Sequence, residues 1–245
     1  MAGMSLARKA ARLPLRLIPN SAVVPILVGP LRGAKWIVGS QRHAFWLGIY
    51  EPQLQQLLVN YLTAGSTFFD IGANVGLYSL LAARLVETGK IVAFEPDPLN
   101  VVFLNRHLTL NRITNVQVYE AAVTDHVGCD SFSDESTHAM GHLSGEGRLS
   151  VATVTLDSLL QSQSIPPPTH IKMDIEGEEY KALRGARQCF RTYKPVLFLA
   201  THGSEVLRDC CELLHSWSYK VETLNREGED RAEIIALPYS SSDPY

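Results

Sequence analysis

Acidic residues are missing from the first fifth of this chain. Residues 1–50 contain seven Lys or Arg and no Asp or Glu, so 15 of the 22 basic residues share the rest of the chain with all 25 acidic ones. A basic arm of this kind can contact a membrane surface or an acidic partner, or it can be a poorly ordered leader. We interpret residues 1–32 as a leader, 33–240 as one domain and 241–245 as a frayed tail.

Cysteine is also scarce, and long apolar runs are missing. The four cysteines form no CxxC pair and two of them are adjacent, which argues against a disulfide framework and a zinc ribbon. No run of about 20 apolar residues predicts a membrane-spanning helix. Prolines interrupt the apolar stretch after the first basic residues, which argues against a secretory signal. We therefore expect a cytoplasmic protein, and the net charge of −3 gives no general attraction to nucleic acid.

Short apolar runs alternate with helical patterns from residue 66 onward. Such alternation predicts an α/β fold with a mostly parallel sheet and helices on both faces. The last two strands are close enough to form an antiparallel C-terminal hairpin. The expected strands are residues 34–38, 67–71, 90–94, 116–120, 151–155, 169–174, 196–200, 219–224 and 232–237. The expected helices are residues 51–61, 77–85, 98–110, 157–160, 178–189 and 205–216. Residues 125–150 are expected to be loops, with an edge hairpin as the alternative.

A glycine loop follows the first of these strands. Gly72 and Gly76 allow a tight turn and a close approach of the backbone to a ligand. The helix after the loop directs its first backbone N–H groups into the same space, where a carboxylate would be stabilised. Asp70, before the loop, could meet an ammonium group. This set of charges suits a ligand with an amino acid at one end.

Two other nucleotide sites do not fit this loop. A phosphate loop requires Lys after its last glycine, and Leu77 stands there. The dinucleotide fingerprint GxGxxG requires glycine at the position of Asn74, which argues against a nicotinamide oxidoreductase.

Acidic residues end the next two strands. Glu95 lies 19 residues after Gly76, where a carboxylate can accept hydrogen bonds from both hydroxyls of a ribose. Glu120 and Ala121, after the third strand, are placed to line a base. Together with the loop, they predict a nucleoside that carries an amino-acid tail, which describes S-adenosylmethionine.

A second polar segment, residues 172–178, follows the fourth main strand. Asp174 is expected at the crevice, where it could hold a methyl acceptor and take its proton, although capping of the next helix would also explain it. His142 and His202 are candidate bases beside the same crevice, and ordinary polar roles are the alternative. We predict no metal site, because Asp174 and His202 supply too few ligands to define one.

The motifs FFDIGANVGLYS, AFEPDP and HIKMDIEGEEYKALRGA, with LGIYEPQLQQLL upstream, resemble the FkbM family of methyltransferases over about residues 46–203. The resemblance implies a Rossmann-like methyltransferase fold and S-adenosylmethionine as cofactor, held by Asp70, Gly72, Asn74 and Gly76 and by Glu95 at its ribose. It also implies O-methylation of a sugar, glycan or secondary metabolite. The family often has Glu two positions before a His after the fifth strand, whereas Ala200 precedes His202 here. That departure favours the alternative of a nucleoside-binding module without turnover.

Overall fold

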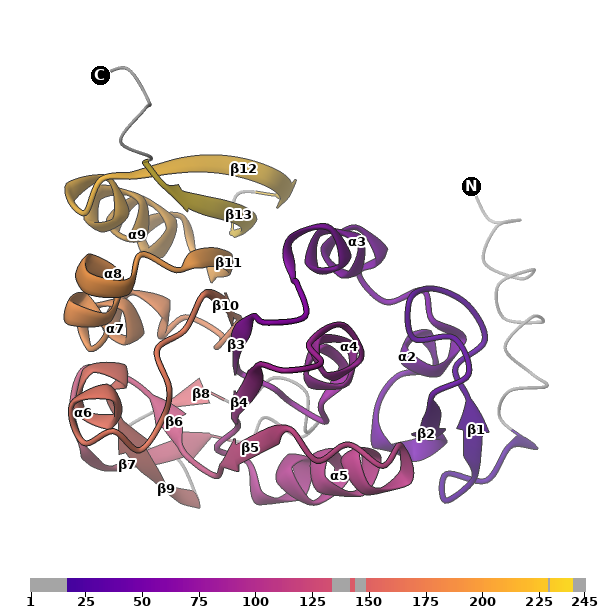
Figure 1. Cartoon of the computed structure of the whole chain (residues 1–245). Coiled ribbons are helices and arrows are strands. Elements are labelled where there is room, and N and C mark those ends of the chain that lie inside the picture. Colours follow the sequence, from indigo (N-terminus) through magenta and orange to yellow (C-terminus); the bar gives the residue numbers. More distant parts are fainter. Residues whose placement is uncertain (1–16, 134–141, 144–148, 229, 240–245) are drawn as a thin grey trace.

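The computed structural model describes residues 17–133, 142–143, 149–228 and 230–239. Its central sheet has seven strands in the order β12-β13-β11-β10-β3-β4-β5 (Figure 1). Five of them are parallel: β3 (Thr67–Ile71), β4 (Lys90–Phe94), β5 (Val116–Tyr119), β10 (His170–Met173) and β11 (Val196–His202). The hairpin of β12 (Tyr219–Glu227) and β13 (Arg231–Pro238) adds two antiparallel strands. The predicted fold class is confirmed.

Helices cover both faces of this sheet (Figure 1). One side carries α3 (Pro52–Tyr61), α4 (Leu77–Leu85) and α5 (Pro98–Leu110), and the other carries α6 (Leu156–Gln161), α7 (Glu179–Arg184), α8 (Arg187–Tyr193) and α9 (Ser204–Ser216). Side chains alternate along β3: Phe68 joins the core under α4, while Phe69 and Ile71 join the core on the other side. Asp70 shares the α4 side, where it accepts a hydrogen bond from Ser79.

The N-terminal region is more structured than expected. Strand β1 (Val23–Pro25) pairs with β2 (Lys35–Ile37), and the sequence continues through η2 (Val38–Ser40) and α2 (His43–Leu47) to α3. Ile26 and Leu31 are each 1% exposed within the same core as α4. Residues 17–32 are therefore part of the folded domain and not of a loose leader, because Ile26 and Leu31 are removed from water while the other large apolar side chains there are partly or largely exposed.

A second sheet occupies much of the segment expected to be loops. Its order is β6-β9-β7-β8, with β6 (Ala122–Val123), β7 (Gly128–Ser133), β8 (His142–Leu143) and β9 (Leu149–Val154). The sequence indicated loops here because Ser, Gly, Asp and His are poor strand formers, but pairing with β6 and β9 overrides that preference.

The helix expected over residues 178–189 is divided. Helix α7 ends at Arg184 with Gly185 as its C-cap, and α8 begins at Arg187. A Cβ at Gly185 would lie 2.1 Å from the carbonyl oxygen of Thr124, so the backbone there packs directly against the start of the second sheet. Among the described helices, none has the length and apolar character required to cross a membrane.

Candidate functional site

A pocket of about 310 Å³ lies at the carboxyl ends of β3, β4 and β10. This is the edge at which ligands bind in open parallel sheets, and the volume falls at the lower end of small-molecule sites, about 300–1,000 Å³. Residues from the glycine loop, from the segment after β4, from the second sheet and from the segment after β10 contribute to its wall. The two predicted half-sites therefore share one cavity.

The glycine loop forms one wall of the pocket. Gly72 adopts a φ of +75°, and a Cβ there would lie 2.0 Å from the backbone oxygen of Asp174. Only glycine allows the ends of β3 and β10 to approach this closely. Asn74 also has a positive φ, +50°, and its side-chain oxygen accepts from the N–H of Val75 and from Gln41. Gly76 caps α4 with a φ of +92° and does not line the pocket.

Asp70 has a different environment from the one we expected. Its side chain is fully buried, it accepts from Ser79 Oγ at 2.6 Å, and its Oδ1 lies 3.6 Å from Lys172 Nζ. Lys172 is its direct register partner on β10, and Lys172 Nζ also donates to Gly72 O at 2.9 Å. Asp70 is not among the residues that line the pocket. The ammonium group of Lys172 thus occupies the place where we expected a ligand ammonium.

Glu95 lies in the pocket wall as predicted. It is 5% exposed, and its Oε2 accepts from the N–H of Asn74 at 2.7 Å. Its Oε1 accepts from the N–H of Asp97 and from Asn100 Nδ2. Burial raises the pKa of Glu95 to about 7, although these hydrogen bonds oppose the shift. Each carboxylate oxygen has two lone pairs, so these three bonds leave one position on Oε2 that can accept a hydrogen bond from a ribose hydroxyl.

The wall beyond Glu95 is mainly apolar. Ala121 lines it together with Phe94, Pro96 and Val123. A planar base could be sandwiched there without leaving polar groups unpaired. Glu120, which we expected beside Ala121, is exposed and outside the pocket, because the chain turns there from β5 toward β6.

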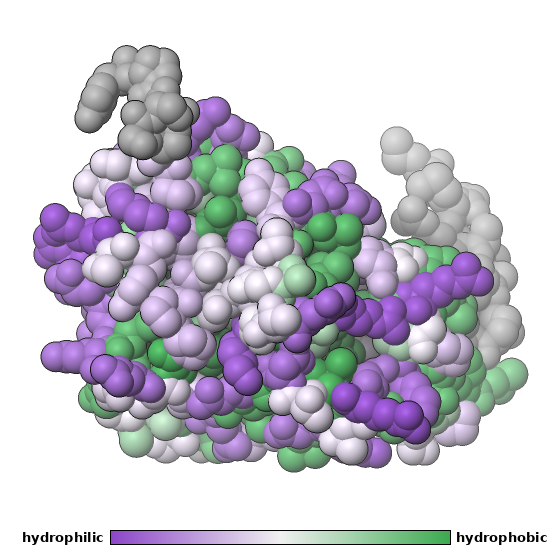
Figure 2. All heavy atoms as spheres, viewed as in Figure 1, coloured by the Kyte–Doolittle hydropathy of each residue, from purple (hydrophilic) through white to green (hydrophobic). Residues whose placement is uncertain are grey.

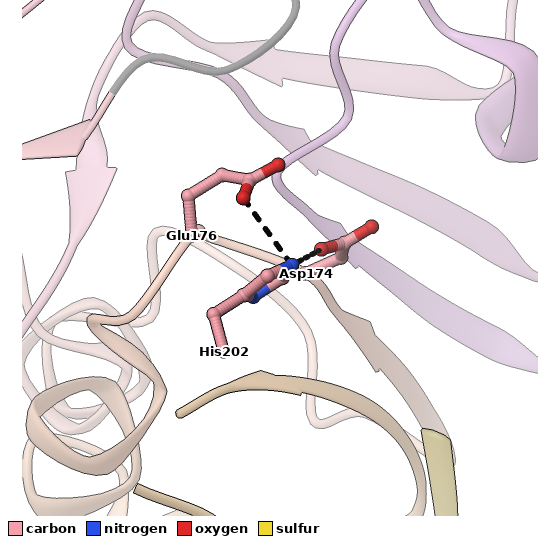
Figure 3. A group of neighbouring side chains, drawn as sticks. All are labelled: Asp174, Glu176 and His202. Carbon is pink, nitrogen blue, oxygen red and sulfur yellow. Dashed lines mark ion pairs between the residues drawn. The ribbon is translucent and has the colours of Figure 1, made fainter. Parts of the chain in front are cut away.

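Asp174, Glu176 and His202 meet in the pocket wall where β10 and β11 end, and we call them the acceptor-side cluster (Figure 3). The Nε2 atom of His202 lies 3.2 Å from Glu176 Oε2 and 3.6 Å from Asp174 Oδ1. Glu176 has a φ of +54°, which is unfavourable for a residue with a side chain and turns it toward the histidine. The structure therefore brings the predicted pair Asp174 and His202 together and adds a third residue.

A buried carboxylate orients the histidine. Glu179 is fully buried, and its Oε1 lies 3.0 Å from His202 Nδ1 while also accepting from the N–H groups of Ile175 and Gly177. This arrangement places the Nδ1 proton toward Glu179 and leaves Nε2 facing the cluster. Burial alone would lower the pKa of His202, but the bond to Glu179 and the other carboxylates together raise it.

A second layer of charge surrounds the cluster. Arg231 Nη2 lies 3.8 Å from Asp174 Oδ2 and 3.5 Å from Glu51 Oε1. Tyr78 donates a hydrogen bond to Glu51, and Tyr50 lines the pocket nearby. Burial raises the pKa of both tyrosines, so they stay neutral hydrogen-bonding groups at physiological pH.

Sequence reasoning did not identify Glu179 or Arg231 as site residues. Glu179 could have been suspected because it follows Glu176 by three residues, the spacing at which a carboxylate near a helix start can turn back. Arg231 reaches the site because of the hairpin register of β13, and no local sequence pattern around it indicates that position. His142 lies on β8, but the structure does not describe its side chain, so its role stays a prediction.

Comparison with known proteins supports a methyltransferase. The protein is 24% identical over 181 residues to the hexuronic acid methyltransferase AglP of Haloferax volcanii, covering 72% of this chain and 74% of the relative. It is 38% identical over 60 residues to the methyltransferase sdnD of Sordaria araneosa, covering 24% of this chain and 23% of the relative.

Solved structures share the fold. A methyltransferase FkbM from Methylobacillus flagellatus superposes with a TM-score of 0.53 at 19% identity, over 71% of this chain and 44% of that one, so the present chain spans less than half of that protein. A Streptococcus mutans protein in complex with SAH has a TM-score of 0.51 at 11% identity, over 76% and 95% of the two chains. The profile described as Methyltransferase FkbM domain matches residues 70–233. Since this match covers well over half of the sequence, the protein belongs to the FkbM family of methyltransferases.

Proposed function

We propose that this protein transfers the methyl group of S-adenosylmethionine to a hydroxyl oxygen of a sugar, glycan or secondary metabolite. The observation that carries the proposal is the pocket itself, in which the glycine loop, Glu95 and the acceptor-side cluster line one cavity. The pocket fits the cofactor in its parts: an apolar slot for the base, a carboxylate for a ribose hydroxyl, and backbone N–H groups at the start of α4 for the amino-acid carboxylate. The cofactor supplies an activated methyl on a sulfonium.

The reaction requires little covalent chemistry from the protein. The acceptor oxygen forms a bond to the methyl carbon, the carbon–sulfur bond breaks, and S-adenosylhomocysteine leaves with the electron pair of that bond. The acceptor proton passes to a base or to solvent. Alignment of the two partners can supply on the order of 7–11 kcal/mol in favourable cases, and a general base about 10²–10⁴-fold in rate. Asp174 is our candidate to hold the acceptor hydroxyl.

The relative AglP points to the first acceptors to try. AglP is a hexuronic acid methyltransferase, and Arg231 at the acceptor end of this pocket could pair with the carboxylate of such a sugar.

A nucleoside-binding module without turnover is the second candidate, favoured by Ala200 in place of an acid. Glu179 weakens that candidate, because it supplies His202 with a carboxylate from another element. Release of S-adenosylhomocysteine with glucuronic or galacturonic acid distinguishes the two.

Donor binding can be tested without knowing the acceptor. Calorimetry with S-adenosylhomocysteine should give one site per chain, and Glu95→Gln should weaken it by about 1.5–3 kcal/mol, the value of a hydrogen bond to a charged group. Glu120→Gln is the matched control, since Glu120 follows the neighbouring strand but is exposed. Equal affinity of the wild type and Glu95→Gln would remove the ribose assignment, and no binding to the wild type would remove the proposed function.

A further inference from the structure

The acceptor-side cluster has an arrangement that hydrogen bonding within it does not explain. His202 Nε2 and Asp174 Oδ1 are both shielded from solvent, and neither has a hydrogen-bond partner among the described residues. Glu176 Oε2 is only 3.2 Å from Nε2, yet the contact does not meet the angular requirements of a hydrogen bond. A protonated imidazolium would normally aim its N–H at one carboxylate. Here Nε2 instead lies 3.2 Å from a Glu176 oxygen and 3.6 Å from an Asp174 oxygen, without a hydrogen bond to either.

The spacing of these atoms matches the edge of a coordination polyhedron. Ligands at about 2.1 Å from a divalent cation stand about 3.0 Å apart in an octahedron and about 3.4 Å apart in a tetrahedron. The distances from His202 Nε2 are 3.2 Å to Glu176 and 3.6 Å to Asp174, and one ligand atom from each residue lies within 4.8 Å of the others. Small side-chain movements would therefore complete a three-ligand site.

The negative charge of the carboxylates around the cluster also favours a bound cation. Asp174, Glu176 and Glu179 all lie within 3.6 Å of His202, and Glu51 adjoins the cluster through its contact with Arg231. Arg231 reaches two of them at 3.5–3.8 Å, and Lys172 is paired with Asp70 instead. Buried carboxylates at this density are stabilised by bound cations.

The environment of His202 is that of a metal-binding imidazole. Metal-ligating histidines commonly donate their other N–H to a carboxylate, which fixes the tautomer and ring orientation. Glu179 is in that position at 3.0 Å from Nδ1, and it is itself held by two backbone N–H groups. Glu179 is fully buried and therefore depends on His202 and the backbone for its partners.

We propose that Asp174, Glu176 and His202 bind one divalent transition cation, with Glu179 as the positioning residue of His202. Imidazole suits Zn²⁺, Fe²⁺ and Ni²⁺ and carboxylates suit Mn²⁺, so this mixed set is compatible with several of these ions. The purpose of the cation rests on the proposed function: all three residues line the pocket, so a cation held by them would adjoin the acceptor. Such a cation would hold an acceptor oxygen and lower the pKa of its hydroxyl.

The test uses Mn²⁺ as the probe and the full chain after treatment with a chelator. Electron paramagnetic resonance of free Mn²⁺ during a titration should show one ion bound per chain. His202→Ala and Glu176→Gln should each weaken Mn²⁺ binding at least tenfold, and Glu179→Gln should weaken it about tenfold by releasing the imidazole. Glu178→Gln is the matched control, because Glu178 lines the same pocket but pairs with Lys181 at 2.9 Å. It should stay within twofold of the wild type.

Binding of S-adenosylhomocysteine, measured on the same preparations, separates the two proposals. Wild-type protein that binds S-adenosylhomocysteine but not Mn²⁺ would overturn the cation site and leave the proposed function intact. Mn²⁺ affinity that is equal in the wild type, His202→Ala and Glu176→Gln would place the ion elsewhere and also overturn it. Retained S-adenosylhomocysteine affinity in each variant establishes that the protein is folded, so a loss of Mn²⁺ then reports on the ligands.

Discussion

Individual side chains in this pocket are in environments that their sequence positions only partly indicate. Glu95 could be predicted because an acid at the end of the second strand has a geometric reason to face a ligand. The pairing of Asp70 with Lys172 could not be predicted, because it depends on the register between two strands that are far apart in the chain. Glu120 was predicted wrongly for a related reason: the turn toward β6 directs it to solvent.

The pH dependence of donor binding should report on Glu95. Its pKa is raised to about 7 by burial, so the carboxylate becomes protonated as the pH falls through 7. A ribose hydroxyl donates to the ionised form, and affinity for S-adenosylhomocysteine should therefore drop roughly tenfold between pH 8 and pH 6. Calorimetry across this range measures the step, and Glu95→Gln should abolish it. A step that persists in Glu95→Gln would belong to another group.

The buried pair of Lys172 and Asp70 should matter for stability. Lys172→Met leaves Asp70 as an uncompensated charge in the core and should lower the free energy of unfolding by about 3–5 kcal/mol. Adding Asp70→Asn should recover part of this loss, because the double variant contains no isolated charge. Urea unfolding of both single variants and the double variant gives the coupling energy. Strictly additive losses would mean that the two side chains do not stabilise each other.

Asp174 should act on the acceptor rather than the donor. Asp174→Asn should preserve affinity for S-adenosylhomocysteine but lower turnover by about 10²-fold or more, since it removes a carboxylate from the acceptor-side cluster. Methyl transfer to a uronic acid, followed by S-adenosylhomocysteine release, is the measurement. A lower melting temperature with unchanged turnover per folded molecule would support a helix-capping role instead.

Among the secondary-structure elements, the strands were the easiest to predict. The bounds of β3 and β4 are those expected, since each is a short apolar run buried on both faces. The break between α7 and α8 was missed, because a glycine within a helical pattern is a weak signal. Its cause, the close approach to Thr124, lies in another part of the chain.

That break gives a prediction for Gly185. Gly185→Ala would place a methyl group 2.1 Å from the carbonyl of Thr124 and should destabilise the protein by about 1–3 kcal/mol through overpacking. Gly65→Ala is the matched control, because its Cβ would meet only Thr88 Oγ1 at 3.9 Å. Thermal unfolding of the two variants compares them. Equal melting temperatures would contradict the close packing of α7 against the second sheet.

For the whole molecule, the sequence predicted one methyltransferase-like domain but began it too late. The surface view shows hydrophobic residues interspersed with hydrophilic ones on the face presented (Figure 2), so surface composition gives no sharp boundary there. The boundary follows instead from burial: Ile26 and Leu31 are in the core. The sequence did not predict this burial, because the basic residues and prolines of the segment interrupt the apolar periodicity that is typical of an amphipathic helix or strand.

Two truncations test that boundary. Deletion of residues 2–16 should leave donor affinity unchanged, since the residues lining the pocket begin at Gln41. Deletion of residues 2–32 removes two fully buried side chains and should cost about 3 kcal/mol or more in the free energy of unfolding. Chemical denaturation and calorimetry on both proteins give the two quantities. Equal free energies of unfolding of the two truncated forms would mean that residues 17–32 do not stabilise the domain and are a leader.

The most direct test of the proposed function is a crystal structure of the protein with S-adenosylhomocysteine. We predict that a ribose hydroxyl donates to Glu95 Oε2 and that the base lies between Ala121 and the segment after β4. The sulfur atom should face Asp174 and His202 across the pocket. A ligand bound elsewhere, or one in this pocket with its ribose away from Glu95, would contradict the account.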